Sequence, residues 1–326
     1  MNVITKRLKS LFVISCFLPL LAVVGASATT PTLTWTRLSP AVSPPARSYL
    51  AMTYDGASRK VLLFGGFDGS GYLNDTWTFD GTTWTRVDTA VAPSARANAQ
   101  MAYDRRTHQV VLFGGYNGID DLGDTWLWDG ATSTWTQAAP AHAPEAVTGP
   151  MVFTDLDGRV DLFGGFDGNF YQDIMWRWTG SDWRRVHLSM VPYARSSAGV
   201  GVNYMSKQIV MFGGLGDVNP YNTWTYDGQT WTMESPATQP LLVYASSTTF
   251  DPNLNTVILF GGGSGGIDQN TTWSWTGTNW EQLFPVQSPG PREGAGIASA
   301  RVLGRTIIFG GQNQTAVLGD TWELTP

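Results

Sequence analysis

The chain has 326 residues, a formal net charge of −6 at pH 7, charged side chains at 14% of its positions and a single cysteine. This acidic balance argues against a nucleic-acid partner and against an anionic membrane surface, because both attract clustered lysine and arginine. Since Cys16 stands alone, a disulfide within the chain and a cysteine-ligated metal cluster are excluded.

The first 28 residues have the pattern of a secretion signal. Basic residues precede an apolar stretch at residues 11–24, and small residues at 26–28 fit a cleavage site. We expect cleavage after Ala28, no membrane insertion of the remaining chain, and a secreted or periplasmic protein. Loss of three positive charges and no acid would take the net charge from −6 to −9. A lipoprotein signal at Cys16 is the alternative.

A repeated Phe-Gly-Gly triplet organises the rest of the chain. Its six copies begin at Phe64, Phe113, Phe163, Phe212, Phe260 and Phe309. A tryptophan follows each copy at a nearly fixed offset, and a second tryptophan follows the first in five of the six repeats. Self-similarity at intervals of 48–50 residues indicates a propeller or solenoid array.

Residues 45–87 contain the elements of one repeat. Apolar or β-prone runs at 49–54 and 60–64 flank a turn, which predicts a hairpin. After the glycines comes a polar loop, and residues 76–79 and 83–87 then alternate with period two around an Asp-Gly turn. We therefore predict four antiparallel strands per repeat, named a to d in chain order.

The two ends of the array complement each other. The sixth repeat stops at Pro326 without a strand d, whereas residues 34–38 match residues 83–87 almost residue for residue. Strand d of the last repeat is thus predicted to come from the start of the mature chain, giving a closure of three strands plus one. Such a closure removes exposed sheet edges.

The glycine doublet after an apolar strand, followed by a spaced aromatic residue and a tryptophan, resembles the kelch repeat. The resemblance spans nearly all of residues 32–326 and implies an all-β fold, a six-bladed β-propeller with four antiparallel strands per blade. We expect residues 29–326 to form one such domain, similar to bacterial secreted kelch proteins and to the propeller of galactose oxidase. The copper site of galactose oxidase is not expected, because it needs a cysteine cross-linked to tyrosine and because His108, His142 and His187 are scattered. We expect no cofactor and no bound metal.

The arrangement of the loops predicts where a ligand binds. In an antiparallel blade the b–c loops and the d–a linkers share one face, and the a–b and c–d turns share the other. The b–c loops are longer and more varied, and varied loops on a rigid scaffold usually carry function. We therefore predict a glycan or protein ligand on the face of the b–c loops and d–a linkers, with Tyr72, Tyr171 and Tyr221 among the aromatic contacts.

Four arginines occupy one position of the repeat, just after the d–a linker: Arg47, Arg96, Arg195 and Arg292. In a structural role, each arginine would pair with an acid or cap backbone carbonyls near the channel. In a functional role, the four would form a site for a carboxylate or an acidic sugar.

Residues that depart from the repeat are the candidates for chemistry. His142 and Glu145 lie in the linker before the third repeat, and Glu293 follows Arg292. These three residues are the only hints of an acid–base set, and the alternative is that each is simply solvated.

Three functions are compatible with these patterns. Because no recognisable catalytic set is present, we favour a monomeric binding module for a glycan or a protein over an enzyme. The enzymatic alternative is a sialic-acid mutarotase, which would use the arginines with Glu145 or Glu293. The third is a protein–protein scaffold of the cell envelope, and fold alone does not choose among them.

Overall fold

The computed structural model describes residues 32–218, 220–241 and 243–326. The secretion signal predicted at residues 1–28 lies outside these residues. Within the described residues, no helix is both long and apolar enough to cross a membrane.

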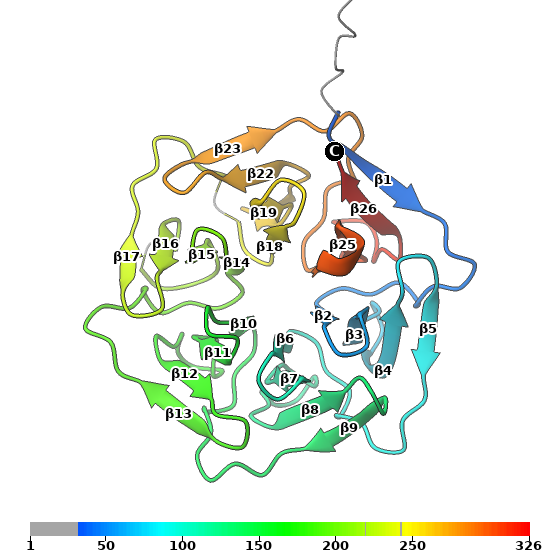
Figure 1. The fold of residues 1–326 in the computed structure, drawn as a ribbon, viewed down its shortest axis with the longest axis vertical. Helices are drawn as coiled ribbons and strands as arrows, with labels where there is room; N and C mark the ends of the chain where they lie inside the picture. The colour runs from blue at the N-terminus through cyan, green and yellow to red at the C-terminus, as the bar shows by residue number, and fades with distance from the viewer. Residues whose placement is uncertain (1–31, 219, 242) are drawn as a thin grey trace, which may run out of the picture. The chain divides into compact units, whose positions relative to one another are not determined.

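Six four-stranded antiparallel sheets, the blades, surround a central axis (Figure 1). Strand a is innermost in each blade and strand d is outermost. Strand b lies between strands a and c and is buried on both faces of the sheet. The apolar run from Val110 to Phe113 illustrates this. Strand d buries little besides its tryptophan. The predicted all-β, six-bladed architecture is confirmed.

The blades follow one another in chain order. Blade 1 contains β2 (Ala51–Asp55), β3 (Lys60–Phe67), β4 (Tyr72–Phe79) and β5 (Trp84–Val87). Blade 2 contains β6 (Gln100–Asp104), β7 (Gln109–Phe113), β8 (Thr125–Asp129) and β9 (Thr134–Gln137). Blade 3 contains β10 (Met151–Thr154), β11 (Val160–Phe163), β12 (Met175–Trp178) and β13 (Trp183–Val186).

The second half repeats this order. Blade 4 contains β14 (Gly199–Asn203), β15 (Gln208–Phe212), β16 (Thr223–Tyr226) and β17 (Trp231–Met233). Blade 5 contains β18 (Ser247–Asp251), β19 (Thr256–Phe260), β22 (Thr272–Trp275) and β23 (Trp280–Leu283), with the small hairpin β20 (Gly263–Ser264) and β21 (Ile267–Asp268) in its b–c loop. Blade 6 contains β24 (Gly296–Ala300), the 3₁₀ turn η1 (Arg301–Leu303), β25 (Arg305–Phe309), β26 (Thr321–Thr325) and β1 (Thr34–Leu38).

Blade 6 closes the ring with strands from both ends of the described chain. β1 pairs antiparallel with β26, in a register that runs from Thr34 opposite Thr325 to Leu38 opposite Thr321. In Figure 1 the two strands lie side by side at the edge of the ring. The predicted closure of three strands plus one is confirmed.

The core lies between blades, in clusters shared by neighbouring sheets. The strand d tryptophan of each blade contacts the Phe-Gly-Gly phenylalanine of the preceding blade, with ring centroids 5.2–6.0 Å apart. The pairs are Trp84–Phe309, Trp135–Phe64, Trp183–Phe113, Trp231–Phe163, Trp280–Phe212 and Trp35–Phe260. Burying one tryptophan stabilises the fold by roughly 4–6 kcal/mol as an upper bound.

The glycine doublets allow this close packing. Gly65 and Gly66 have φ angles of 64° and 108°, which glycine adopts without strain. A Cβ on Gly65 would lie 2.7 Å from the carbonyl oxygen of Arg96 in the next blade, and one on Gly66 would lie 2.9 Å from that of Ser48. Any other residue would push the neighbouring backbone away.

The b–c connection of blade 1 is more regular than the sequence suggested. Residues 67–74 were expected to form a loop, but Phe67 pairs with Tyr72 and Gly66 with Leu73, past a register shift at the glycines. The reason is a tight turn in which the Asp68 carboxylate accepts hydrogen bonds from the backbone of Ser70 and Gly71.

Candidate ligand-binding face

A closed circle of backbone hydrogen bonds marks the end of the channel where the d–a linkers enter strand a. Each blade contributes one residue, whose N–H donates to the carbonyl oxygen of its counterpart in the preceding blade at 2.7–3.0 Å. The members are Tyr49, Asn98, Gly149, Ser197, Ala245 and Gly294. The bond from Tyr49 to Gly294 completes the circle, so blades 1 and 6 are joined here as the other neighbours are.

All six members of this circle have left-handed backbones, with φ between 50° and 61°. Four of them carry side chains, for which this conformation is uncommon and costs free energy. The circle surrounds a cavity of only about 60 Å³, so the channel is narrow at this end. The b–c loops and d–a linkers around it form what we call the linker face.

The four arginines predicted as ligand contacts lie beneath the linker face and are buried. In blade 1, Arg47 forms two hydrogen bonds with the Asp75 carboxylate, at 2.5 and 2.9 Å, and donates to the carbonyl oxygens of Pro45 and Gly65. Asp75 also accepts from the indole N–H of Trp77. Burial alone would raise the pKa of Asp75, but the Arg47 guanidinium and the indole lower it.

The same arrangement recurs around Arg96 with Asp124 and around Arg292 with Asp320. Arg195 differs, because its partners are the Asn222 side chain and backbone carbonyls, and burial lowers its pKa to about 10. The structural role considered for these arginines, pairing with acids and capping carbonyls, is therefore present. Direct ligand contact by them stays a prediction.

The three tyrosines predicted as aromatic contacts have different surroundings. Tyr72 packs between Phe67 and Tyr116, with ring centroids 5.3 and 5.8 Å away, at the junction of blades 1 and 2. Tyr171 packs on Phe166 at 5.0 Å, and Tyr221 is 45% exposed. Two of the three rings thus pack against other aromatic rings, Tyr171 within its own loop and Tyr72 also across to the next blade.

The three acid–base candidates lie apart. His142 is exposed and its Nδ1 lies 2.9 Å from the Asp182 carboxylate, whereas Glu145 is exposed in the same linker. Glu293 lies in blade 6, and no hydrogen bond or ion pair among the described residues joins the three. The described part of the chain also holds no group of three His, Cys, Asp or Glu residues placed to bind a metal.

Glu293 is the one candidate at the centre of a polar cluster. Its Oε1 accepts a 2.5 Å hydrogen bond from the Tyr49 hydroxyl and a 3.1 Å bond from the Gln312 amide. Ser48 donates to the other end of that amide at 2.9 Å and so orients it. Glu293 is 9% exposed, and its buried Oε2 has no well-formed hydrogen bond among the described residues, although the Tyr244 hydroxyl of blade 5 interacts with the carboxylate.

The free oxygen of Glu293 points over Gly263 of blade 5. A Cβ there would lie 2.1 Å from Glu293 Oε2 and 2.7 Å from the Tyr244 ring. Burial and the Glu293 charge raise the pKa values of Tyr244 and Asp268, and for Tyr244 a hydrogen bond with Glu293 adds to the effect. The cluster therefore carries negative charge and suits a hydrogen-bond donor.

Tyr49, Tyr244 and Gln312 were not predicted as site residues, although an internal alignment contains a signal for two of them. In blades 1 to 4 the small residue after the arginine position pairs with a bulky residue after the glycine doublet, as Ser48 pairs with Phe67. Blade 5 reverses the sizes with Tyr244 opposite Gly263, and blade 6 has Glu293 opposite Gln312.

Exposed apolar side chains stand on four successive b–c loops of the linker face. Their exposed fractions are 56–84%. They are Ile119 in blade 2, Phe170 in blade 3, Val218 in blade 4 and Ile267 in blade 5. Exposed apolar residues that recur on neighbouring loops of one face are candidates for an interaction site.

Six blades with buried arginines, glycine doublets and inter-blade tryptophans define a β-propeller built from kelch repeats. In agreement, the family model of the KLHDC2/KLHL20/DRC7 Kelch-repeats domain matches residues 26–186. Residues 26–186 thus match a kelch-repeat domain, and the described residues together form a six-bladed β-propeller. A comparison with curated proteins gave no match.

Proposed function

We propose that this kelch propeller is a secreted or periplasmic binding module, without catalysis, that recognises a protein ligand on the linker face. Kelch propellers typically act as binding modules. The observation that carries the proposal is the recurrence of an exposed apolar side chain on each b–c loop of blades 2 to 5. Such side chains lose contact with water when a partner covers them, which is the main favourable term in association.

The Glu293 cluster supplies the polar part of the same recognition. A buried carboxylate oxygen that lacks a well-formed hydrogen bond is stabilised when a well-placed donor reaches it. A lysine, arginine or backbone N–H of the ligand would provide that donor. Because Asp268 lies near Glu293, a positively charged donor is favoured.

A protein ligand is favoured over a glycan by the kind of side chain exposed. Glycans are held mainly by open aromatic rings, and two of the tyrosines predicted for this purpose pack against neighbouring rings. Three of the four exposed loop residues are aliphatic, and these suit a protein surface.

The proposal is tested with immobilised protein exposed to secreted and envelope proteins of its host, with bound proteins quantified by mass spectrometry. Replacing Ile119, Phe170 and Ile267 together by aspartate should abolish capture of a specific partner, and Glu293→Gln should weaken its affinity by at least about tenfold. The matched control is Met205→Asp, which changes an equally exposed residue on a turn of the opposite face and should retain the partner.

Two results would contradict the proposal. One is a partner that the triple variant and the Met205 variant capture equally well. The other is binding in a parallel glycan array, lost in the triple variant, without any protein partner, which would establish the glycan alternative.

A further inference from the structure

A large cavity fills the channel at the end opposite the circle of hydrogen bonds. Its volume is about 600 Å³, which is in the range of small-molecule sites. Strand a of every blade lines it, and so do residues of the a–b turns, including Gly56 and Arg105. The cavity therefore opens on the face of the a–b turns and narrows toward the linker face.

The charged residues that line this cavity are all basic. Arg105 and Arg301 lie at its mouth with His108, and no aspartate or glutamate is among the lining residues. This is unexpected in a chain with 26 acidic and 20 basic residues. A low-dielectric wall that carries one sign of charge concentrates ligands of the opposite sign.

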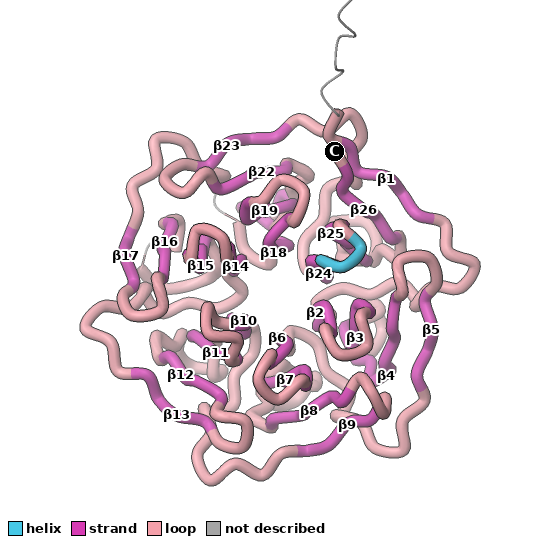
Figure 2. Tube along the Cα trace, in the orientation of Figure 1, coloured by secondary structure: helices cyan, strands magenta, loops and turns pink. Residues whose placement is uncertain are grey.

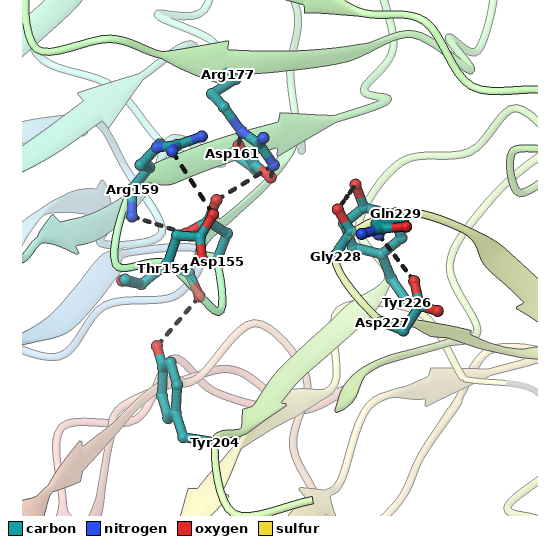
Figure 3. Close-up of polar contacts among 11 residues, drawn as sticks. Thr154, Asp155, Arg159, Asp161, Arg177, Tyr204, Tyr226, Asp227, Gly228 and Gln229 are labelled. Carbon is teal, nitrogen blue, oxygen red and sulfur yellow. Dashed lines mark hydrogen bonds and ion pairs between the residues drawn. The ribbon is translucent and has the colours of Figure 1, made fainter. Parts of the chain in front are cut away.

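The two arginines converge on one tyrosine. The guanidinium carbon of Arg105, in blade 2, lies 3.7 Å from the centroid of the Tyr204 ring, and that of Arg301, in blade 6, lies 4.3 Å from it. Tyr204 belongs to blade 4 and is held by a hydrogen bond from its hydroxyl to the Thr154 carbonyl oxygen, drawn in Figure 3. Residues from three blades thus place two positive charges against the same aromatic ring.

Neither guanidinium is neutralised within the described part of the chain. No ion pair or side-chain hydrogen bond joins Arg105 or Arg301 to another described residue. Stacking on a ring engages the face of a guanidinium and leaves its in-plane N–H donors available, in the geometry that a carboxylate, sulfonate or phosphate accepts.

Arg301 is held in place by the 3₁₀ turn η1, which Figure 2 shows in cyan close to β24. Its guanidinium also lies 5.1 Å from the Phe250 ring. Burial and the neighbouring charge of Arg105 lower its pKa. Two like charges held near each other cost free energy, and an anion that contacts both guanidinium groups would offset that cost.

We propose that the channel cavity binds a small organic anion, with its oxyanion group held by Arg105 and Arg301 and its body inside the channel. The wall suits such a body, since apolar residues such as Val152, Val200 and Ile297 alternate with polar ones such as Gln100 and Thr248. Tyr54 and Ser299 of the same wall have buried hydroxyls without a partner among the described residues, and these add polar contacts.

The test uses the fluorescent probe 8-anilinonaphthalene-1-sulfonate, an aromatic sulfonate, with the uncharged N-phenyl-1-naphthylamine as its neutral counterpart. The sulfonate should bind at a single saturable site and more tightly than the neutral probe. Arg105→Gln and Arg301→Gln should each weaken the affinity by about tenfold or more, as loss of a charge-assisted hydrogen bond does. Added salt should weaken binding further.

Arg106→Gln is the matched control, because Arg106 is adjacent to Arg105 and exposed but does not line the cavity. It should bind the sulfonate as the unchanged protein does. Arg301→Lys, which keeps the charge without the planar fork, should fall between the unchanged protein and Arg301→Gln. Circular dichroism and the melting temperature establish that each variant is folded.

The proposal is overturned if folded Arg105→Gln and Arg301→Gln variants bind the sulfonate as tightly as the Arg106 variant. Equal affinity for the two probes would also overturn it, because the cavity would then be an apolar site. Capture of a protein ligand on the linker face is measured separately and should be unchanged in the arginine variants.

Discussion

At the scale of single residues, the most unusual group is the carboxylate of Asp161 in the core of blade 3. The other blades have apolar residues at this position of strand b, such as Leu62 in blade 1 and Val111 in blade 2. Asp161 is fully buried and forms hydrogen bonds of 2.7 and 2.8 Å with Arg177 on the neighbouring strand (Figure 3). Arg177 also contacts Asp155 at 3.2 Å.

Burial raises the pKa of Asp161 to about 6, against the opposing effect of Arg177. Because the ordinary value is near 4, the folded protein binds more protons than the unfolded chain between about pH 4 and pH 6. The contribution of Asp161 to stability is therefore largest below that interval and decreases as pH rises through it. Over the interval this decrease should be on the order of 2–3 kcal/mol.

The measurement is urea unfolding at a series of pH values, for the unchanged protein and for Asp161→Asn. The amide does not titrate, so the stability of the variant should lack the decrease between about pH 4 and pH 6. Equal slopes in the two proteins would show that Asp161 keeps an ordinary pKa. Asp75, Asp124 and Asp320, whose pKa values are lowered, act in the opposite direction and below about pH 4.

The candidate site was only partly predictable at this scale. Glu293 was identified because it breaks the repeat, and the structure places it in a polar cluster. The basic mouth of the channel was missed. Arg105 and Arg301 lie in turns without a repeated position, and no sequence pattern shows that turns of blades 2 and 6 meet over Tyr204.

At the scale of elements, hydrogen bonds across blades repeat as regularly as the strands. The indole N–H of the strand d tryptophan donates to the threonine directly before the first tryptophan of strand c in the preceding blade, at 2.9–3.1 Å. The threonines are Thr76, Thr125, Thr223, Thr272 and Thr321. Blade 3 has Met175 there, and the Trp231 N–H has no partner among the described residues.

Replacing Thr125 by valine keeps the shape of the side chain and removes the acceptor of the Trp183 N–H. The free energy of unfolding should fall by about 1–2 kcal/mol, because the buried donor loses its partner. Chemical denaturation measures this, with Thr136→Val on exposed β9 as the control that should have little effect. No loss in the Thr125 variant would mean that this hydrogen bond contributes nothing net.

The strands themselves were predictable because their pattern is local. Alternation around a turn and an apolar run before two glycines identify strands b, c and d in every repeat. The circle of hydrogen bonds was not predictable, because its members Tyr49, Asn98, Gly149, Ser197, Ala245 and Gly294 share a backbone conformation and no side-chain type. Their common φ angle is imposed by the neighbouring blades.

At the scale of the whole molecule, closure depends on a strand from the other end of the described chain. Trp35 of β1 is fully buried against Phe260 of blade 5 and donates its indole N–H to Thr272. It therefore makes the same contacts as the tryptophans inside the array. If β1 closes the ring as firmly as an internal strand does, Trp35 contributes as much stability as they do.

Trp35→Ala should accordingly lower the free energy of unfolding by about 3–5 kcal/mol, as loss of a large buried side chain does. Trp183→Ala, inside the array, is the matched comparison and should have an effect of similar size. Guanidinium denaturation of both variants provides the measurement. A much smaller effect for Trp35 would indicate that β1 detaches before the rest of the ring unfolds.

The tryptophan contacts all point the same way around the ring, from each blade to the one before it in the chain. Damage to one blade is therefore asymmetric in its effects. The neighbour that follows loses the covering of its largest aromatic side chain, whereas the neighbour that precedes keeps its own tryptophan buried. Unfolding that begins in one blade should therefore spread first to the blade that follows it in the chain, and not equally to both neighbours.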